Sequence, residues 1–268
     1  MKKIGFLSLV MSLLVVSLIS CTDAPGMGNS GASNTAIADA LAQARASAAD
    51  GYYDEAAILW MHAVANAEST ETLSNDLIER LMKHDYLLAQ INCFYLADEL
   101  SPIDILGLCD AFCWAYYYME FDDYQEAILA YPAQYLEPER IVILGEKTIA
   151  KLANDYFGLQ HYKLDYNSPE VLEYHTFLIE EYPDYKDYVM QNNGFCYFPW
   201  DADPPQLIYK SSQSLGNKMF YIILEQGWYY DVDPVITGDL HLIIKENNSF
   251  FGYEVISVLQ NHEISLIK

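Results

Sequence analysis

The sequence contains few basic residues. Its 268 residues include 14 Lys and Arg against 38 Asp and Glu, which gives a formal net charge of −24. Proteins that bind nucleic acid need Lys and Arg to neutralise phosphates, and adhesion to anionic lipid headgroups needs them as well. The composition therefore argues against both classes of partner, and we expect a soluble, acidic surface with no nucleic-acid ligand.

The short motifs of common catalytic and metal sites are also missing. None of the six His residues lies three or four positions from another, and HExxH, paired CxxC, GxSxG and Gly-rich phosphate-loop motifs do not occur. His161 and His175 could converge with Glu173, and Asp201 could lie in a cation-binding loop, but surface histidines and solvated acidic loops are commoner. An envelope hydrolase has no motif to support it. We expect no enzyme, no metal and no cofactor.

The N-terminus combines three features. Lys2 and Lys3 are basic, residues 4–19 are apolar and uncharged, and Ser20-Cys21 supplies a small residue followed by a thiol. This stretch resembles a bacterial lipoprotein signal, in which the cysteine is lipidated and becomes the first residue of the mature protein. A simple N-terminal anchor helix is the alternative, but the apolar run is short for a membrane span.

The resemblance implies a location and a partner. Residues 1–20 are then a signal peptide, and the protein is bound to a membrane through a lipid on Cys21. We expect this to be the outer membrane rather than the inner one. Its body lies outside the cytoplasm in the bacterial cell envelope. Residues 21–36 are predicted to be a flexible tether, because their Gly, Pro, Ser and Asn residues bury too little apolar surface to become ordered.

Helical patterns dominate residues 37–192. Gly51-Tyr52-Tyr53-Asp54-Glu55-Ala56, followed by Trp60, has the same aromatic and Ala spacing as Tyr124, Ala127 and Tyr131. Both segments resemble the inner turn of a degenerate tetratricopeptide repeat, which implies antiparallel helical hairpins. Further helices are expected over residues 73–100, 137 to about 152, and 168–182. Another helix is expected to begin at residue 102.

The pattern changes in residues 193–268. Segments rich in Ile, Val, Tyr and Phe are expected as strands, with turn-like separators between them, at residues 219–224, 228–232, 240–244, 250–259 and 264–267. Short connections between successive strands predict an antiparallel meander. The predicted fold class is α+β, with the β-rich region packed on the helices.

The tyrosines and cysteines are candidate functional residues. Of 23 Tyr, we take Tyr117, Tyr185 and Tyr188 as candidate partner-binding residues, since exposed Tyr combines a large apolar area with a polar tip. Buried thiols and disulfides both remain open for the other cysteines, which are Cys93, Cys109, Cys113 and Cys196.

Two functions follow from these features. The first is a membrane-anchored interaction scaffold that binds an envelope protein, because helical hairpins form grooves that hold peptides or domains. The alternative is a glycan-binding accessory lipoprotein that uses exposed tyrosines. That plan resembles the starch-binding outer-membrane lipoproteins, although those chains are about twice as long and no residues match.

Overall fold

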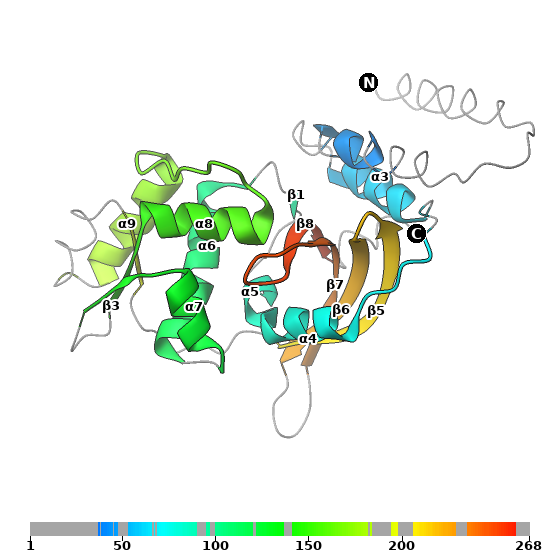
Figure 1. The fold of residues 1–268 in the computed structure, drawn as a ribbon. Coiled ribbons are helices and arrows are strands. Elements are labelled where there is room, and N and C mark those ends of the chain that lie inside the picture. The colour runs from blue at the N-terminus through cyan, green and yellow to red at the C-terminus, as the bar shows by residue number, and fades with distance from the viewer. Residues whose placement is uncertain are drawn as a thin grey trace, which may run out of the picture. The chain divides into compact units, whose positions relative to one another are not determined.

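Two antiparallel sheets organise the chain in the computed structural model (Figure 1). The larger sheet has the spatial order β1-β8-β7-β6-β5, and the smaller has the order β2-β3-β4. The strands are β1 (Tyr95–Leu96), β2 (Gln134–Leu136), β3 (Ile141–Gly145), β4 (Gly194–Tyr197), β5 (Gln206–Gly216), β6 (Met219–Trp228), β7 (Val235–Glu246) and β8 (Tyr253–Gln260). With the helices below, these sheets confirm the predicted α+β class.

The structure describes residues 37–47 except 38 and 45, 53–89 except 66 and 68, 95–96, 100–119, 122–136, 141–183 except 182, 194–197, 206–228 and 235–260. All of these belong to one compact unit, residues 31–268. The helices are α3 (Tyr53–Ala65), α4 (Asn75–Lys83), α5 (Asp85–Ala89), α6 (Pro102–Cys113), the π-helical turn η2 (Trp114–Tyr118), α7 (Tyr124–Ala130), α8 (Glu146–Phe157) and α9 (Pro169–Glu181).

The predicted C-terminal meander is confirmed for strands β6, β7 and β8, which pair in chain order. The structure adds β5, which the sequence pattern did not predict. The segment 225–227, expected as a separator, lies inside β6, where a register shift at Gly227 accommodates it as a bulge. The expected strand 264–267 lies outside the described residues.

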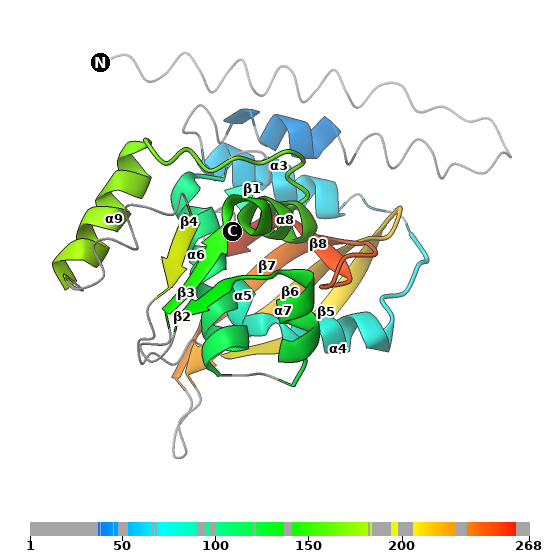
Figure 2. The same cartoon turned by 60° about the vertical axis from the view of Figure 1, so that its left-hand side comes forward.

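The larger sheet is buried on both faces. Ile222 and its neighbour Leu242 point to the main core, which the helices α4, α5, α6 and α8 also enter. Tyr221 and Ile243 point to the opposite face, where a second core includes Trp60 of α3. Both views place α3 on one side of this sheet and α4 on the other (Figures 1 and 2).

Trp60 lies against the larger sheet. It is fully buried, it meets Tyr221 edge-on at 5.6 Å, and its indole N–H donates to the Ser257 hydroxyl of β8. The segment around it therefore packs on the sheet, in an apolar cluster that also includes the helical residues Ile37, Leu41 and Ala44. The second segment does form helical contacts, because α7 packs against η2 and buries Ala127 and Tyr131. A tetratricopeptide-like array remains a prediction.

Two expected helices are wrong in part. Residues 141–145, expected inside a helix that begins near residue 137, form β3, and α8 begins only at Glu146. Strand β3 is buried and pairs with β4 through Val142–Tyr197 and Leu144–Phe195. The expected helix over residues 73–100 is divided into α4, α5 and β1, which pairs with β8.

Candidate ligand-binding cleft

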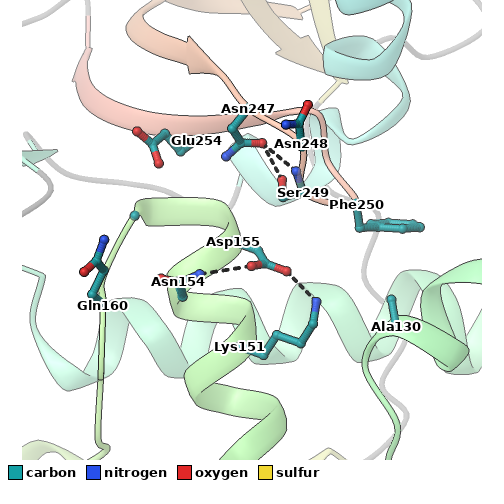
Figure 3. Close-up of a pocket in the computed structure, with 11 residues that line it drawn as sticks. Ala130, Lys151, Asn154, Asp155, Gln160, Asn247, Asn248, Ser249, Phe250 and Glu254 are labelled. Carbon is teal, nitrogen blue, oxygen red and sulfur yellow. Dashed lines mark hydrogen bonds and ion pairs between the residues drawn. The ribbon is translucent and has the colours of Figure 1, made fainter.

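An open cleft of about 710 Å³ lies between α8 and the turn that joins β7 to β8 (Figure 3). This volume lies within the range of small-ligand sites, about 300–1,000 Å³. The lining is mainly polar and is formed by Ala130, Lys151, Asn154, Asp155, Gly158, Gln160, Asn247, Asn248, Ser249, Phe250 and Glu254.

Helix α8 provides one wall of the cleft, and a glycine lies at each of its ends. It begins after Gly145 and ends at Gly158, which has a left-handed φ of +70° and whose N–H donates to the Asn154 carbonyl. Glycine adopts this conformation without the strain that a Cβ would bring. The last turns of α8 therefore present Lys151, Asn154 and Asp155 to the cleft (Figure 3).

Asp155 is held by three side chains. The Tyr131 hydroxyl donates to Oδ2 at 2.9 Å, the Lys151 ammonium binds the same oxygen, and the Asn154 amide donates to Oδ1 at 3.1 Å. Lys151 also lies 4.1 Å from the centre of the Tyr131 ring. The carboxylate is thus fixed in position, and its charge is balanced by Lys151.

The β7–β8 turn provides the other wall. Asn247 Oδ1 accepts hydrogen bonds from the backbone N–H of Ser249 at 2.9 Å and from its hydroxyl at 2.7 Å, an arrangement typical of an Asx turn. The backbone N–H of Asn247 donates to the Gly252 carbonyl at 3.0 Å and closes the turn. These bonds fix the polar tip that faces α8.

Phe250 forms the apolar end of the cleft. Its ring contacts Tyr116, Tyr131 and Phe251 at centroid distances of 5.9, 5.7 and 5.3 Å, all in edge-on geometry. Because these partners belong to the main core or pack on it, the half-buried ring is held by the body of the protein.

A buried polar pair lies behind Phe250. His84 is only 2% exposed, its ring is 5.6 Å from that of Phe250, and its Nε2 is 3.5 Å from Asp123 Oδ2. Burial lowers the pKa of His84, although Asp123 opposes this shift. Burial raises the pKa of Asp123, but hydrogen bonds from His84 and Lys83 outweigh it, so the net pKa lies below its ordinary value.

Among the predicted partner-binding tyrosines, Tyr117 belongs to the described residues and does not line this cleft. Tyr117 is half-buried, and its hydroxyl donates to the Tyr131 carbonyl at 3.0 Å. Burial, together with nearby Cys113, raises the pKa of Tyr117 to about 12. Tyr185, Tyr188 and the lipidation residue Cys21 lie outside the described residues.

The described cysteines are buried. Cys109 and Cys113 carry free thiols, and burial raises the pKa of both. Burial also raises the pKa of Cys196 to about 12. A buried thiol whose pKa is raised is a poor nucleophile. Cys93 lies outside the described residues.

Helix α9 carries a second surface, which we call the α9 surface. Val171 and Leu178 are buried on one side of the helix, and the opposite side is exposed. Leu172 and Phe177 are 50% and 55% exposed there. The α9 surface consists of Glu170, Leu172, Glu173, Thr176, Phe177 and Glu180.

Two features are absent from the part of the chain that the structure describes. No group of three or more His, Cys, Asp or Glu side chains in it could hold a metal ion. No helix in that part is long and apolar enough to cross a membrane.

Comparisons with known proteins give no relative. No family model matches the chain, and neither a curated protein nor a solved structure resembles it significantly. No residue that lines the cleft was a predicted site residue, and Tyr131, which binds Asp155 from behind the lining, was predicted only as a repeat position. Polar residues at 247–249 marked a turn, but no sequence signal placed that turn opposite α8.

Proposed function

We propose that this protein is a lipid-anchored interaction scaffold of the bacterial cell envelope, tethered through Cys21 and without catalytic activity. The observation that carries the scaffold role is the α9 surface, where Leu172 and Phe177 are exposed beside Glu170, Glu173 and Glu180. Exposed large apolar side chains on a soluble body favour an interaction site.

The charge of the α9 surface selects the kind of partner. Three carboxylates beside two apolar side chains complement a basic amphipathic segment, whose apolar residues cover Leu172 and Phe177 while its Lys and Arg meet the Glu residues. The lipid tether would keep the scaffold and a membrane-bound partner at high effective concentration, so a modest intrinsic affinity is sufficient.

Lipid attachment is tested by feeding an alkyne-labelled fatty acid to bacteria that express the full chain. We expect label on the wild type and none on Cys21→Ser, and we expect the wild type in the outer-membrane fraction of a density gradient. Equal labelling of the two chains would reject lipidation at Cys21.

Partner binding is tested by crosslinking in intact cells. A Leu172→Ser/Phe177→Ser chain should lose the crosslinked envelope protein, and added salt should weaken the wild-type complex because charges contribute to it. Leu129→Ser on α7 is the matched control, since Leu129 is 83% exposed but lies outside the α9 surface. The same crosslinks in all three chains would argue against this surface.

Glycan recognition is the second candidate function. The specific observation in its favour is the polar cleft beside α8. Tyr117, one of the tyrosines expected to bind the glycan, already uses its hydroxyl in an internal hydrogen bond. This candidate and the α9 scaffold concern different surfaces, so that one can fail while the other holds.

A further inference from the structure

Each charged side chain that lines the cleft is paired with an opposite charge, although Lys245 itself lies outside the lining. Lys151 is paired with Asp155, and Glu254 is paired with Lys245 at 3.4 Å. An anionic ligand would meet two carboxylates, while a cationic ligand would have to compete with lysines that are already in place. The ligand that fits without breaking these pairs is neutral.

The remaining polar groups are amides and a hydroxyl. Asn154, Asn248 and Gln160 line the cleft with exposed side chains, and Ser249 lies on the opposing turn (Figure 3). A side-chain amide both donates and accepts hydrogen bonds, as the hydroxyl groups of a sugar do. A cleft built from amides therefore matches a ligand that carries several hydroxyls.

The apolar end adds a second requirement. Phe250 offers a ring that is fixed by Tyr116 and Tyr131, whereas the rest of the lining is polar. A hydrocarbon ligand would leave the amides unpaired, which is costly. A saccharide ring has an apolar C–H face as well as hydroxyl edges, so it satisfies both parts of the cleft.

We infer that the cleft between α8 and the β7–β8 turn binds a neutral saccharide. One sugar ring stacks on Phe250, and its hydroxyls bind the side chains of Asn154 and Asp155 on one wall and of Asn248 and Ser249 on the other. The bonds that Tyr131, Lys151 and Asn154 make to Asp155 hold this carboxylate ready to accept from a hydroxyl. This inference rests on the glycan-binding candidate and is independent of the α9 surface.

Saccharide binding is measured with the full lipidated chain in detergent micelles, by saturation-transfer NMR and calorimetry. The probes are maltose, cellobiose and chitobiose as neutral disaccharides, and digalacturonate as an anionic one. We expect saturable binding of at least one neutral disaccharide, and weaker binding or none of digalacturonate.

Two variants locate the site. Asn248→Ala removes one exposed amide and should weaken binding by about 3- to 10-fold, the loss of one or two net hydrogen bonds. Phe250→Leu removes the stacking ring and should weaken binding more. Asn75→Ala on α4, an exposed amide outside the cleft, is the matched control and should bind like the wild type.

The inference is overturned if no neutral disaccharide binds, if digalacturonate binds more tightly, or if Asn248→Ala and Phe250→Leu both bind like the wild type. Circular dichroism of each variant separates loss of the site from loss of the fold. The crosslinking experiment on the α9 surface gives an independent result, so failure of the saccharide site leaves the scaffold proposal standing.

Discussion

The hydroxyl of Tyr131, a fully buried residue, donates a 2.9 Å hydrogen bond to the carboxylate of Asp155 at the cleft. Burial raises the pKa of Tyr131, and Asp155 raises it further, so the hydroxyl keeps the proton that it donates. The aromatic core and the polar wall of the cleft are therefore joined by this bond, which makes the position of Asp155 depend on the packing of the core.

Tyr131→Phe should lower the free energy of unfolding by about 1.5 kcal/mol, because a buried hydrogen bond to a charged group contributes about 1.5–3 kcal/mol and Lys151 still binds Asp155. Urea denaturation measures the change. Tyr124→Phe is the control: its hydroxyl accepts only an exposed bond from Gln125, and we expect less than about 0.5 kcal/mol. Equal effects of both substitutions would contradict the role given to the Tyr131–Asp155 bond.

The sequence predicted the β-rich C-terminus because Ile, Val and Tyr are concentrated there. It failed at Ile141–Leu144, where four successive apolar residues are all buried. A run of this kind fits a buried helix as well as a buried strand, because periodicity cannot distinguish them. This run forms a strand because it pairs with β4, which lies far along the chain.

The cleft could not be predicted for a related reason. Its two walls, α8 and the β7–β8 turn, are separated along the chain by α9, by β4 of the smaller sheet and by strands β5, β6 and β7. Each polar residue, such as Asn154 or Asn248, is ordinary within its own segment. Only the packing of α8 against β8 brings them together.

Stability should decrease in mildly acidic solution. Burial lowers the pKa of His84, and also the pKa values of His175 and His241. The unfolded chain, whose histidines titrate near pH 6.5, then binds more protons than the folded chain below that pH. The free energy of unfolding should therefore be constant above about pH 7 and fall as the pH drops below about 6.5.

Urea denaturation at a series of pH values between 8 and 5 measures this slope. His84→Gln should make it shallower, while Gln125→Ala, at an exposed polar residue, should leave it unchanged. Asp123 contributes to stability in a separate pH range. Because the folded protein lowers the pKa of Asp123, its stabilising contribution is lost only when the pH falls below the ordinary pKa of 3.8. A wild-type stability that is flat from pH 7.5 to 5.5 would refute the histidine contribution.

The bond between Trp60 and Ser257 should couple α3 to the larger sheet. Ser257→Ala leaves the indole N–H buried without its acceptor and should cost about 1–3 kcal/mol. Trp60→Phe removes the donor as well as part of the packing, so the double variant should cost less than the sum of the single variants. Urea denaturation of the four chains gives the coupling free energy.

A coupling close to zero would show that the Trp60 indole gains nothing from Ser257. Trp60→Ala serves as the upper limit, at about 3–5 kcal/mol, because it also leaves a cavity beside Tyr221. Ile58→Ala, on the same helix but 42% exposed, is the matched control, and its effect should stay within about 0.5 kcal/mol.

Two glycines should respond to alanine with opposite signs. Gly252 has a φ of +79°, and an added Cβ would lie 2.9 Å from Cδ of Arg80, so Gly252→Ala should destabilise the protein by about 1–2 kcal/mol. Gly107 lies within α6 with no atom inside 4 Å of an added Cβ, so Gly107→Ala should stabilise by about 0.5–1 kcal/mol. Thermal and urea denaturation of both variants measure the two changes.

Gly252 also helps to close the turn that forms one wall of the cleft. Its carbonyl accepts the bond from Asn247 that closes the β7–β8 turn, and its N–H donates to Ser249 at 3.0 Å. Strain at residue 252 should thus displace the wall that carries Asn248 and weaken saccharide binding, whereas Gly107→Ala should not. Unchanged saccharide affinity in a destabilised Gly252→Ala chain would mean that the turn plays no part in the site.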